Sequence, residues 1–233
     1  MVTGTWSPPD SPQGPGGVIS SAMPAEPEIK HAVSFIDGQN LYRHAKDAFG
    51  HHHPNYDPRK LAEAVCAECG WVNYGVRFYT GVPSADRSPL WHQYWMRRLT
   101  TMRRAGIVVT SRNLRYRVEE TRLSDGSILE VPVEREKGID LRLGLDVVRM
   151  ARNAELDVAI IFSQDQDLSE VAQEVRDISR STGRWLKVVS AFPAGPTATV
   201  RRGIDRTDWF RMNREFYDAC LDPRDYRPDR RRR

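Results

Sequence analysis

The feature that most constrains the fold of this chain is the alternation of short apolar runs with longer amphipathic stretches. Apolar runs rich in Val, Ile and Phe predict strands, and apolar residues spaced three or four apart predict helices. Strands are predicted at residues 32–36, 76–80, 107–109, 157–162 and 185–192, and helices at residues 57–70, 88–105, 139–154, 168–182 and 211–220. Strands that alternate with helices build a mainly parallel sheet covered on both faces, so the sequence predicts an α/β fold.

Two local signals refine this prediction. Asp57 and Pro58 are the residue types expected at a helix N-cap and at the first helical position. An extended stretch after the third strand reaches the turn signal Ser124-Asp125-Gly126-Ser127 and returns through Ile128. The sequence therefore predicts an inserted β-hairpin between residues 118 and 131.

The composition indicates one domain with flexible ends. Of the 233 residues 39% are hydrophobic, enough for one sizeable core. No apolar run approaches the roughly 18–20 residues of a membrane span. Residues 1–30 are rich in Pro, Gly and Ser and lack the pattern of a signal peptide, which predicts a disordered N-terminal arm and a cytoplasmic protein. We expect the domain at residues 31–192 and a C-terminal extension with a short helix and a basic tail at residues 193–233.

Cysteine, histidine and net charge carry little functional information. Three cysteines do not make a disulfide framework, and Cys66 and Cys69 fall within a predicted helix without a second pair. The histidines at residues 51–53 are adjacent on a predicted loop, and we expect them to be solvated. A net charge of +4 and a pI near 9.1 are weak evidence for a polyanionic partner.

The positions of four aspartates are more informative. Asp37 directly follows the first strand, and Asp165 and Asp167 follow the most apolar one. Asp140 lies where the returning hairpin meets a helix start. Ligands of open parallel sheets bind outside the C-terminal ends of the strands. The four carboxylates therefore converge if the first and fourth parallel strands are neighbours.

A cluster of this kind predicts a metal site. Like charges raise one another's pKa, so four carboxylates that share a small space need a cation to stay ionised. Hard oxygen ligands with open positions suit Mg²⁺ or Mn²⁺, which can polarise a phosphodiester and activate water. Asp146 falls on a different face of its helix from Asp140 and is expected outside the direct ligands. The chain has neither a glycine-rich phosphate loop nor a Ser-His-Asp arrangement.

Each of these aspartates also has a structural interpretation. Asp167 with Glu170 is close to a capping box, Asp140 is acceptable as an N-cap, and Asp37 before Gly38 suits an Asx turn. Helix N-termini favour negative charge, so capping and metal binding are compatible.

Three segments together resemble a known family. Phe35-Ile36-Asp37-Gly38-Gln39-Asn40-Leu41, Lys137-Gly138-Ile139-Asp140 with Asp146, and Phe162-Ser163-Gln164-Asp165-Gln166-Asp167-Leu168 resemble the NYN domain, the LabA-like branch of the PIN-like nucleases, over about residues 31–192. The resemblance implies a PIN-like Rossmannoid three-layer fold and a metal-dependent ribonuclease that leaves 5′-phosphate and 3′-hydroxyl ends. It implies catalytic and metal-binding roles for Asp37, Asp140, Asp165 and Asp167, with Asp146 as a further member. Asn40 would orient a ligand and Ser163 would support the loop. Gln164 and Gln166 depart from the family, which often has small residues there.

Several residues are candidates for binding the nucleic acid. Lys137, Arg201 and Arg202 are expected on the site's side of the sheet and are assigned to phosphate contacts. Arg97 and Arg104 lie opposite the apolar stripe of helix 88–105, whereas Arg98 falls inside it and is expected to snorkel. Trp91, Tyr94 and Trp95 suit base stacking, but their spacing favours the core.

The sequence thus predicts a metal-dependent ribonuclease that hydrolyses RNA phosphodiester bonds with Mg²⁺ or Mn²⁺. The alternative is a catalytically weak RNA-binding or regulatory NYN module that acts with a partner. A phosphatase with a nucleophilic aspartate is disfavoured because Gln39 stands two residues after Asp37, where that chemistry needs a second aspartate. A homo-oligomer or a regulatory protein partner stays open, and no membrane partner is expected.

Overall fold

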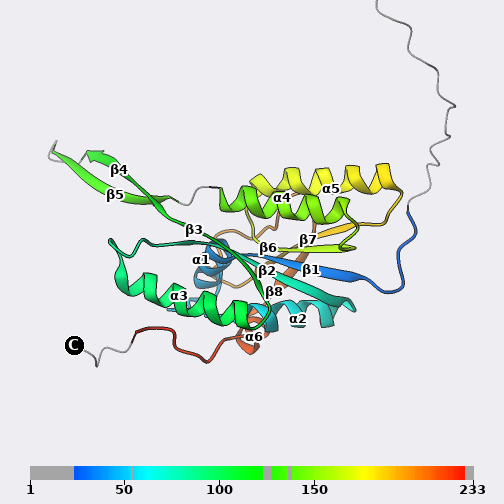
Figure 1. Ribbon diagram of the computed structural model, residues 1–233, viewed down its shortest axis with the longest axis horizontal. Helices are drawn as coiled ribbons and strands as arrows, with labels where there is room; N and C mark the ends of the chain where they lie inside the picture. The colour runs from blue at the N-terminus through cyan, green and yellow to red at the C-terminus, as the bar shows by residue number, and fades with distance from the viewer. Residues whose placement is uncertain (1–23, 54, 123–126, 136–137, 229–233) are drawn as a thin grey trace, which may run out of the picture.

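A six-stranded parallel sheet forms the centre of the computed structural model, which describes residues 24–53, 55–122, 127–135 and 138–228 (Figure 1). The strand order is β3-β2-β1-β6-β7-β8, and every neighbouring pair is parallel. Their bounds are β1 His31–Asp37, β2 Val72–Val82, β3 Val108–Asn113, β6 Val158–Phe162, β7 Lys187–Pro193 and β8 Asp208–Met212. The first and fourth parallel strands, β1 and β6, are therefore neighbours, as the convergence of the aspartates requires.

Helices cover both faces of this sheet. They are α1 Gly38–Phe49, α2 Pro58–Cys69, α3 Pro89–Arg104, α4 Ile139–Arg152, α5 Ser169–Thr182 and α6 Arg214–Ala219, with a 3-10 turn η1 at Gln166–Leu168. In Figure 1, α4 and α5 lie side by side on one face, and α2, α3 and α6 lie on the other. The predicted three-layer α/β fold is confirmed.

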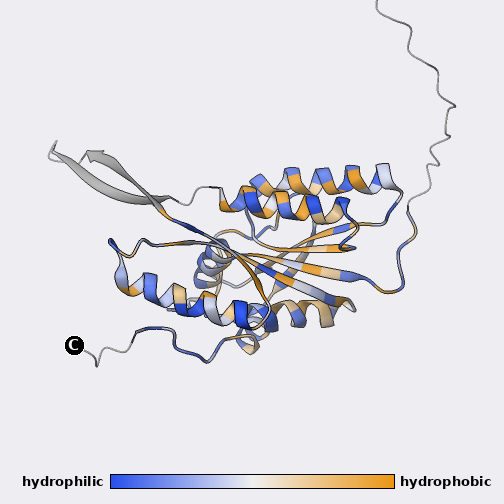
Figure 2. Cartoon of the chain, in the orientation of Figure 1, coloured by the Kyte–Doolittle hydropathy of each residue, from blue (hydrophilic) through white to orange (hydrophobic). Residues whose placement is uncertain are grey.

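Alternating side chains of the central strands supply a core to each layer. Ala32 and Ile36 of β1 pack with α1, α2 and α3, whereas Val33 and Phe35 pack with α4 and α5. Figure 2 shows these strands mostly in hydrophobic colours and the helices with mixed surfaces. This two-sided burial explains the unbroken apolar runs, because a parallel strand covered on both faces has no solvated side.

The predicted cap of α2 and the predicted antiparallel hairpin are confirmed. Asp57 caps α2 by accepting hydrogen bonds from the backbone N–H groups of Arg59 and Lys60, and Gly70 ends the helix in the left-handed conformation with φ 68°. β4 Arg115–Arg122 and β5 Ile128–Arg135 pair antiparallel as a separate two-stranded sheet.

Two elements, α1 and β8, were not predicted from the sequence. α1 buries an apolar stripe, Leu41, Ala45, Ala48 and Phe49, between polar residues that dilute the periodicity. β8 is an edge strand of five residues whose side chains are mostly exposed. Edge strands lack the apolar pattern of a buried strand, so β8 gives a weak signal.

Other expectations have different outcomes. Cys66 and Cys69 lie in α2, the helix in which they were expected, and both are free thiols. The expectation that His51 is solvated is wrong, because its ring is partly buried and its Nε2 lies 2.6 Å from Asp218 Oδ1. Most of the N-terminal arm, the tip of the hairpin turn, Lys137 and the terminal arginines at residues 230–233 lie outside the described residues. Among the helices of the described chain, none has the length and apolarity to cross a bilayer.

Candidate active site

The candidate site lies at the C-terminal ends of β1 and β6, where the strand order reverses, because β2 and β3 lie on one side of β1 and the later strands on the other. Ile36 is paired with Phe162, so the segments that follow each strand, starting with Asp37 and Ser163, leave the sheet side by side. In chain order the parallel strands run 3-2-1-4-5-6, and the crevice between the first and fourth is the usual ligand site of such sheets.

Asp37 is the buried centre of this site. Only 7% of the residue is exposed, and its Oδ1 accepts a hydrogen bond of 3.0 Å from the Asn40 backbone N–H as the N-cap of α1. The pKa of Asp37 is raised to about 6, mainly by burial. The negative charges of Asp165 and Asp140 also raise it, and the Asn40 N–H and Arg43 lower it. The carboxyl group is thus in an environment that disfavours its own negative charge.

Asn40 and Ser163 join the two segments. The Asn40 Oδ1 accepts a hydrogen bond of 3.0 Å from the Gln164 backbone N–H. The Ser163 hydroxyl lies 3.5 Å from Asp37 Oδ2 and accepts a bond of 3.2 Å from the Asp165 backbone N–H. Both side chains therefore hold the loop after β6 against the start of α1, in line with the loop-supporting role expected for Ser163.

The remaining carboxylates reach the same edge from helix starts. Asp140 lies in the first turn of α4 after Gly138, which is the N-cap with φ 74°, so the expected alternative of Asp140 as the N-cap is wrong. Asp165 caps η1 by accepting a hydrogen bond of 3.1 Å from the Asp167 backbone N–H, which makes Asp165 rather than Asp167 the capping residue. Asp140 and Asp167 both line a hollow of about 340 Å³ between α4 and α5.

The four aspartates thus share one edge without forming a closed cluster. Asp37 interacts electrostatically with Asp165 and Asp140, and Asp167 lies farther out, on the hollow beside α4. Within the residues that the structure describes, no three His, Cys, Asp or Glu side chains are grouped closely enough to hold a metal ion. An ion at this edge would need water or substrate oxygens among its ligands.

A comparison with known families decides the identity of the domain. The NYN domain family model matches residues 31–202, which include β1 to β7 and the four aspartates of the candidate site. The chain belongs to the NYN domain family. This family is associated with PIN-like nucleases. No curated protein matches the chain.

Two solved structures resemble the fold only weakly. A protein of unknown function from Vibrio parahaemolyticus is 16% identical with a TM-score of 0.49, covering 82% of this chain and 98% of its own. MurG from Acinetobacter baumannii is 13% identical with a TM-score of 0.30, covering 78% and 45%. Neither similarity supports an argument about function.

Gln164 and Gln166 bind the basic loop at residues 200–205. Gln164 Nε2 donates to the carbonyl oxygens of Val200 and Arg202, at 3.2 and 2.8 Å. Gln166 Nε2 donates to the Gly203 carbonyl oxygen at 3.0 Å, and its Oε1 accepts from the Asp205 N–H. The glutamines therefore fix the segment that carries Arg201 and Arg202 next to the loop after β6.

Asp146 lies in a different environment from the other aspartates. Only 2% of it is exposed, and its carboxylate accepts hydrogen bonds from Tyr79 Oη and from Arg142. The guanidinium groups of Arg77 and Arg149 lie 3.7 and 3.8 Å away. Asp146 is thus neutralised by protein cations and joins α4 to β2.

Two residues of the site were missed because α1 was missed. Arg43 and His44 follow Asn40 by three and four positions, which on a helix places them on the same side. Arg43 acts electrostatically on Asp37 and His44 interacts with Asp165. Burial lowers the pKa of His44, and the positive charge of Arg43 lowers it further. A capping aspartate followed by polar residues was the available signal.

Proposed function

We propose that this NYN domain is a metal-dependent ribonuclease that hydrolyses RNA phosphodiester bonds. The observation that supports this most is the buried Asp37, whose pKa is raised to about 6 by burial and by the facing charges of Asp165 and Asp140. A buried carboxyl group that is repelled by two other carboxylates does not stabilise the fold. It suits a site where a cation compensates the charge.

The donor set fits Mg²⁺ or Mn²⁺. All candidate ligands are carboxylate oxygens, and Mg²⁺ keeps several waters and binds proteins through one or two carboxylates together with substrate phosphates. Asp37 and Asp165 would hold the ion, with Asp140 nearby and Asp167 toward the rim. A bound ion of this kind lowers the pKa of water and neutralises charge on the phosphate.

The protein groups around the ion position the substrate. Asn40 and Ser163 hold the two carboxylate-bearing segments together through the bonds described above. Arg43, Arg201 and Arg202 are exposed near this edge and would bind RNA phosphates. These residues would orient the phosphodiester and keep the carboxylates in place during hydrolysis.

Substitution of the carboxylates tests the proposal. Single-stranded RNA is incubated with the protein in Mn²⁺ or in EDTA, alongside Asp37→Asn, Asp165→Asn and the control Asp177→Asn. Asp177 is an exposed carboxylate of α5 in a surface ion pair with Arg180. We expect cleavage to fall by about 100-fold or more in both site variants and in EDTA, because the ion contributes several kcal/mol to the reaction. Equal cleavage by all four proteins would refute the proposed site.

One observation favours a second candidate, an RNA-binding or regulatory module with little catalysis. Among the described residues the carboxylates are not grouped closely enough to hold a metal by themselves. RNA binding that survives EDTA, with no cleavage in Mn²⁺ or Mg²⁺, would support this candidate over the ribonuclease.

A further inference from the structure

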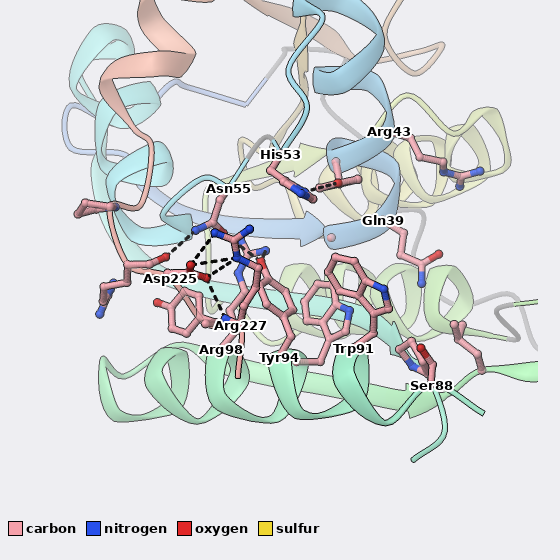
Figure 3. Close-up of a pocket in the computed structure, with 18 residues that line it drawn as sticks. Gln39, Arg43, His53, Asn55, Ser88, Trp91, Tyr94, Arg98, Asp225 and Arg227 are labelled. Atoms are coloured by element: carbon pink, nitrogen blue, oxygen red, sulfur yellow. Dashed lines mark hydrogen bonds and ion pairs between the residues drawn. The ribbon is translucent and has the colours of Figure 1, made fainter. Parts of the chain in front are cut away.

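A second hollow lies directly beside the candidate active site. It has a volume of about 620 Å³ and lies between the start of α1, one side of α3 and the C-terminal segment at residues 223–227. Figure 3 shows Trp91 and Tyr94 directed from α3 into the space below α1, which carries Gln39 and Arg43, and Arg98 beside Asp225 and Arg227 of the C-terminal segment. The volume is within the ~300–1,000 Å³ range typical of sites for small organic groups.

The α3 side of this pocket is a row of aromatic rings. The Trp91 and Tyr94 ring centroids are 5.5 Å apart, and those of Tyr94 and Trp95 are 5.7 Å apart. Trp95 packs against Phe78 of the core, whereas Trp91 is 46% exposed. The expectation that all three rings belong to the core is therefore wrong for Trp91, which presents an indole surface to the pocket.

Arg98 adds a buried positive charge to the same pocket. Only 2% of it is exposed, so the expected snorkelling to solvent is wrong. Its Nη2 donates to the Tyr56 carbonyl oxygen at 2.9 Å, but its buried Nε has no hydrogen-bond partner. Throughout the described chain, no carboxylate pairs with Arg98. Its Nη1 donates to Tyr94 Oη at 3.3 Å and its guanidinium lies over the Tyr56 and Trp95 rings, so its contacts in the protein are with neutral groups. A ligand anion would compensate its charge further.

The C-terminal segment forms the opposite wall. The buried Asp222 accepts hydrogen bonds from Tyr226 Oη at 2.6 Å and from Arg224 Nε at 2.8 Å. Asn55 Nδ2 donates to the carbonyl oxygens of Asp222 and Arg224. Tyr226 in turn meets Tyr94 edge to face, with centroids 6.0 Å apart. This wall lies beyond the part of the chain that matches the NYN domain, so the pocket is an addition to it.

The pocket and the carboxylate site share residues of α1. Gly38 lines the pocket and directly follows Asp37. Arg43 also lines the pocket and acts electrostatically on Asp37. In the described residues Arg43 forms no ion pair, so its charge is available to a ligand that extends from one site to the other.

We propose that this pocket binds an unpaired base of single-stranded RNA, stacked on Trp91, with the adjoining phosphates facing Arg43 and Arg98. The inference rests on the proposed function and specifies its substrate as single-stranded RNA. Aromatic rings interleaved with cations suit this ligand, since every base has a face that stacks and every nucleotide carries a negative phosphate. A base within a duplex is already stacked and paired, so a duplex cannot fill the pocket.

Binding in EDTA tests the pocket without requiring cleavage. The probe is a fluorescently labelled RNA of about ten nucleotides, used single-stranded or annealed to its complement, with binding followed by anisotropy. The proteins are the wild type, Trp91→Ala, Trp91→Phe and the control Tyr74→Ala. Tyr74 is 65% exposed and lies near the start of β2, at the opposite edge of the sheet.

We expect Trp91→Ala to weaken single-strand binding about tenfold, with Trp91→Phe and Tyr74→Ala close to the wild type. Duplex binding is weaker and is the same for all four proteins. Unchanged single-strand binding by Trp91→Ala would overturn the proposal, and so would an equal loss for single strand and duplex. Asp37→Asn does not change a residue that lines the pocket, so we expect it to bind single-stranded RNA normally without cleaving it. The pocket proposal and the ribonuclease proposal can therefore fail independently.

Discussion

Replacement of Asp146 tests whether this carboxylate has a structural role, unlike Asp37 and Asp165, which are proposed to bind the metal ion. Asp146→Ala removes the acceptor of the buried Tyr79 hydroxyl and of Arg142, at 2.9 Å each. It also removes a carboxylate that lies within 4 Å of both Arg77 and Arg149. We expect a loss of stability without a loss of metal binding.

The magnitude follows from the burial of each partner. A hydrogen bond to a charged group contributes about 1.5–3 kcal/mol, and the Tyr79 bond keeps this value because both groups are buried. The Arg142 side chain is 48% exposed, so solvent screening reduces its contribution to about 1 kcal/mol. Asp146→Ala should therefore lower the free energy of unfolding by about 3 kcal/mol. Asp146→Asn, which keeps an acceptor oxygen for Tyr79, should cost about half as much.

Urea denaturation in EDTA measures this loss, and Mn²⁺ titration of the folded variant measures metal binding. With an m-value of about 3 kcal/mol/M, the midpoint for Asp146→Ala shifts down by about 1 M. Metal affinity and cleavage per folded molecule should match the wild type. An unchanged midpoint combined with lost Mn²⁺ binding would refute this reasoning and make Asp146 a metal ligand.

Two further predictions concern the C-terminal wall and a close backbone contact. Burial raises the pKa of Asp222, but its bonds with Arg224 and Tyr226 lower it more, so the net shift is downward. The stabilisation by ionised Asp222 is therefore complete above the unfolded carboxyl pKa of about 3.9 and is lost as pH falls through the lower pKa of the folded state. We expect the fluorescence of the pocket tryptophans to change at a higher pH than the far-UV circular dichroism. Simultaneous changes in both signals would contradict this prediction. At Gly195 a Cβ would lie 1.9 Å from the Ala48 carbonyl oxygen, so Gly195→Ala should cost about 1–3 kcal/mol in urea unfolding. The control Gly75→Ala, whose Cβ meets nothing within 4 Å, should be close to neutral, and equal midpoints for both variants would contradict the contact.

The parts of the fold that the sequence predicts are those with strong periodic burial. β6 is apolar throughout and β1 is mostly buried, because helices cover both faces of the sheet, and α2 has capping residues at both ends. α1 and β8 carry weaker patterns, since α1 is largely polar and β8 is a short edge strand. The positions of α1 and β8 are determined by tertiary contacts, which cannot be predicted from a local sequence pattern.

The candidate site divides in the same way. The positions of Asp37 and Asp165 follow from the rule that parallel strands end at one edge, so their approach could be predicted once β1 and β6 were neighbours. The partners of Asp146 could not, because Arg77 and Tyr79 come from β2 and meet α4 only in the folded sheet. The pocket could not be predicted either, because it depends on contacts between segments that are far apart in the sequence. Residues 223–227 are held near α3 by contacts with Asn55.

The relation between the pocket and the carboxylates depends on α1. The Asn40 N–H in its first turn donates a hydrogen bond to Asp37, the N-cap of the helix, and Gly38, Gln39 and Arg43 line the aromatic pocket. A Cβ at Gly38 would lie 2.5 Å from the Phe78 ring and 3.1 Å from the Tyr79 carbonyl oxygen, so the helix start is packed directly on β2. A base held on Trp91 would therefore be fixed relative to Asp37 through one rigid helix end. Under this arrangement the C-terminal wall would select single-stranded RNA, and the aspartates proposed to bind the metal ion would lie next to the phosphodiester that follows the bound base.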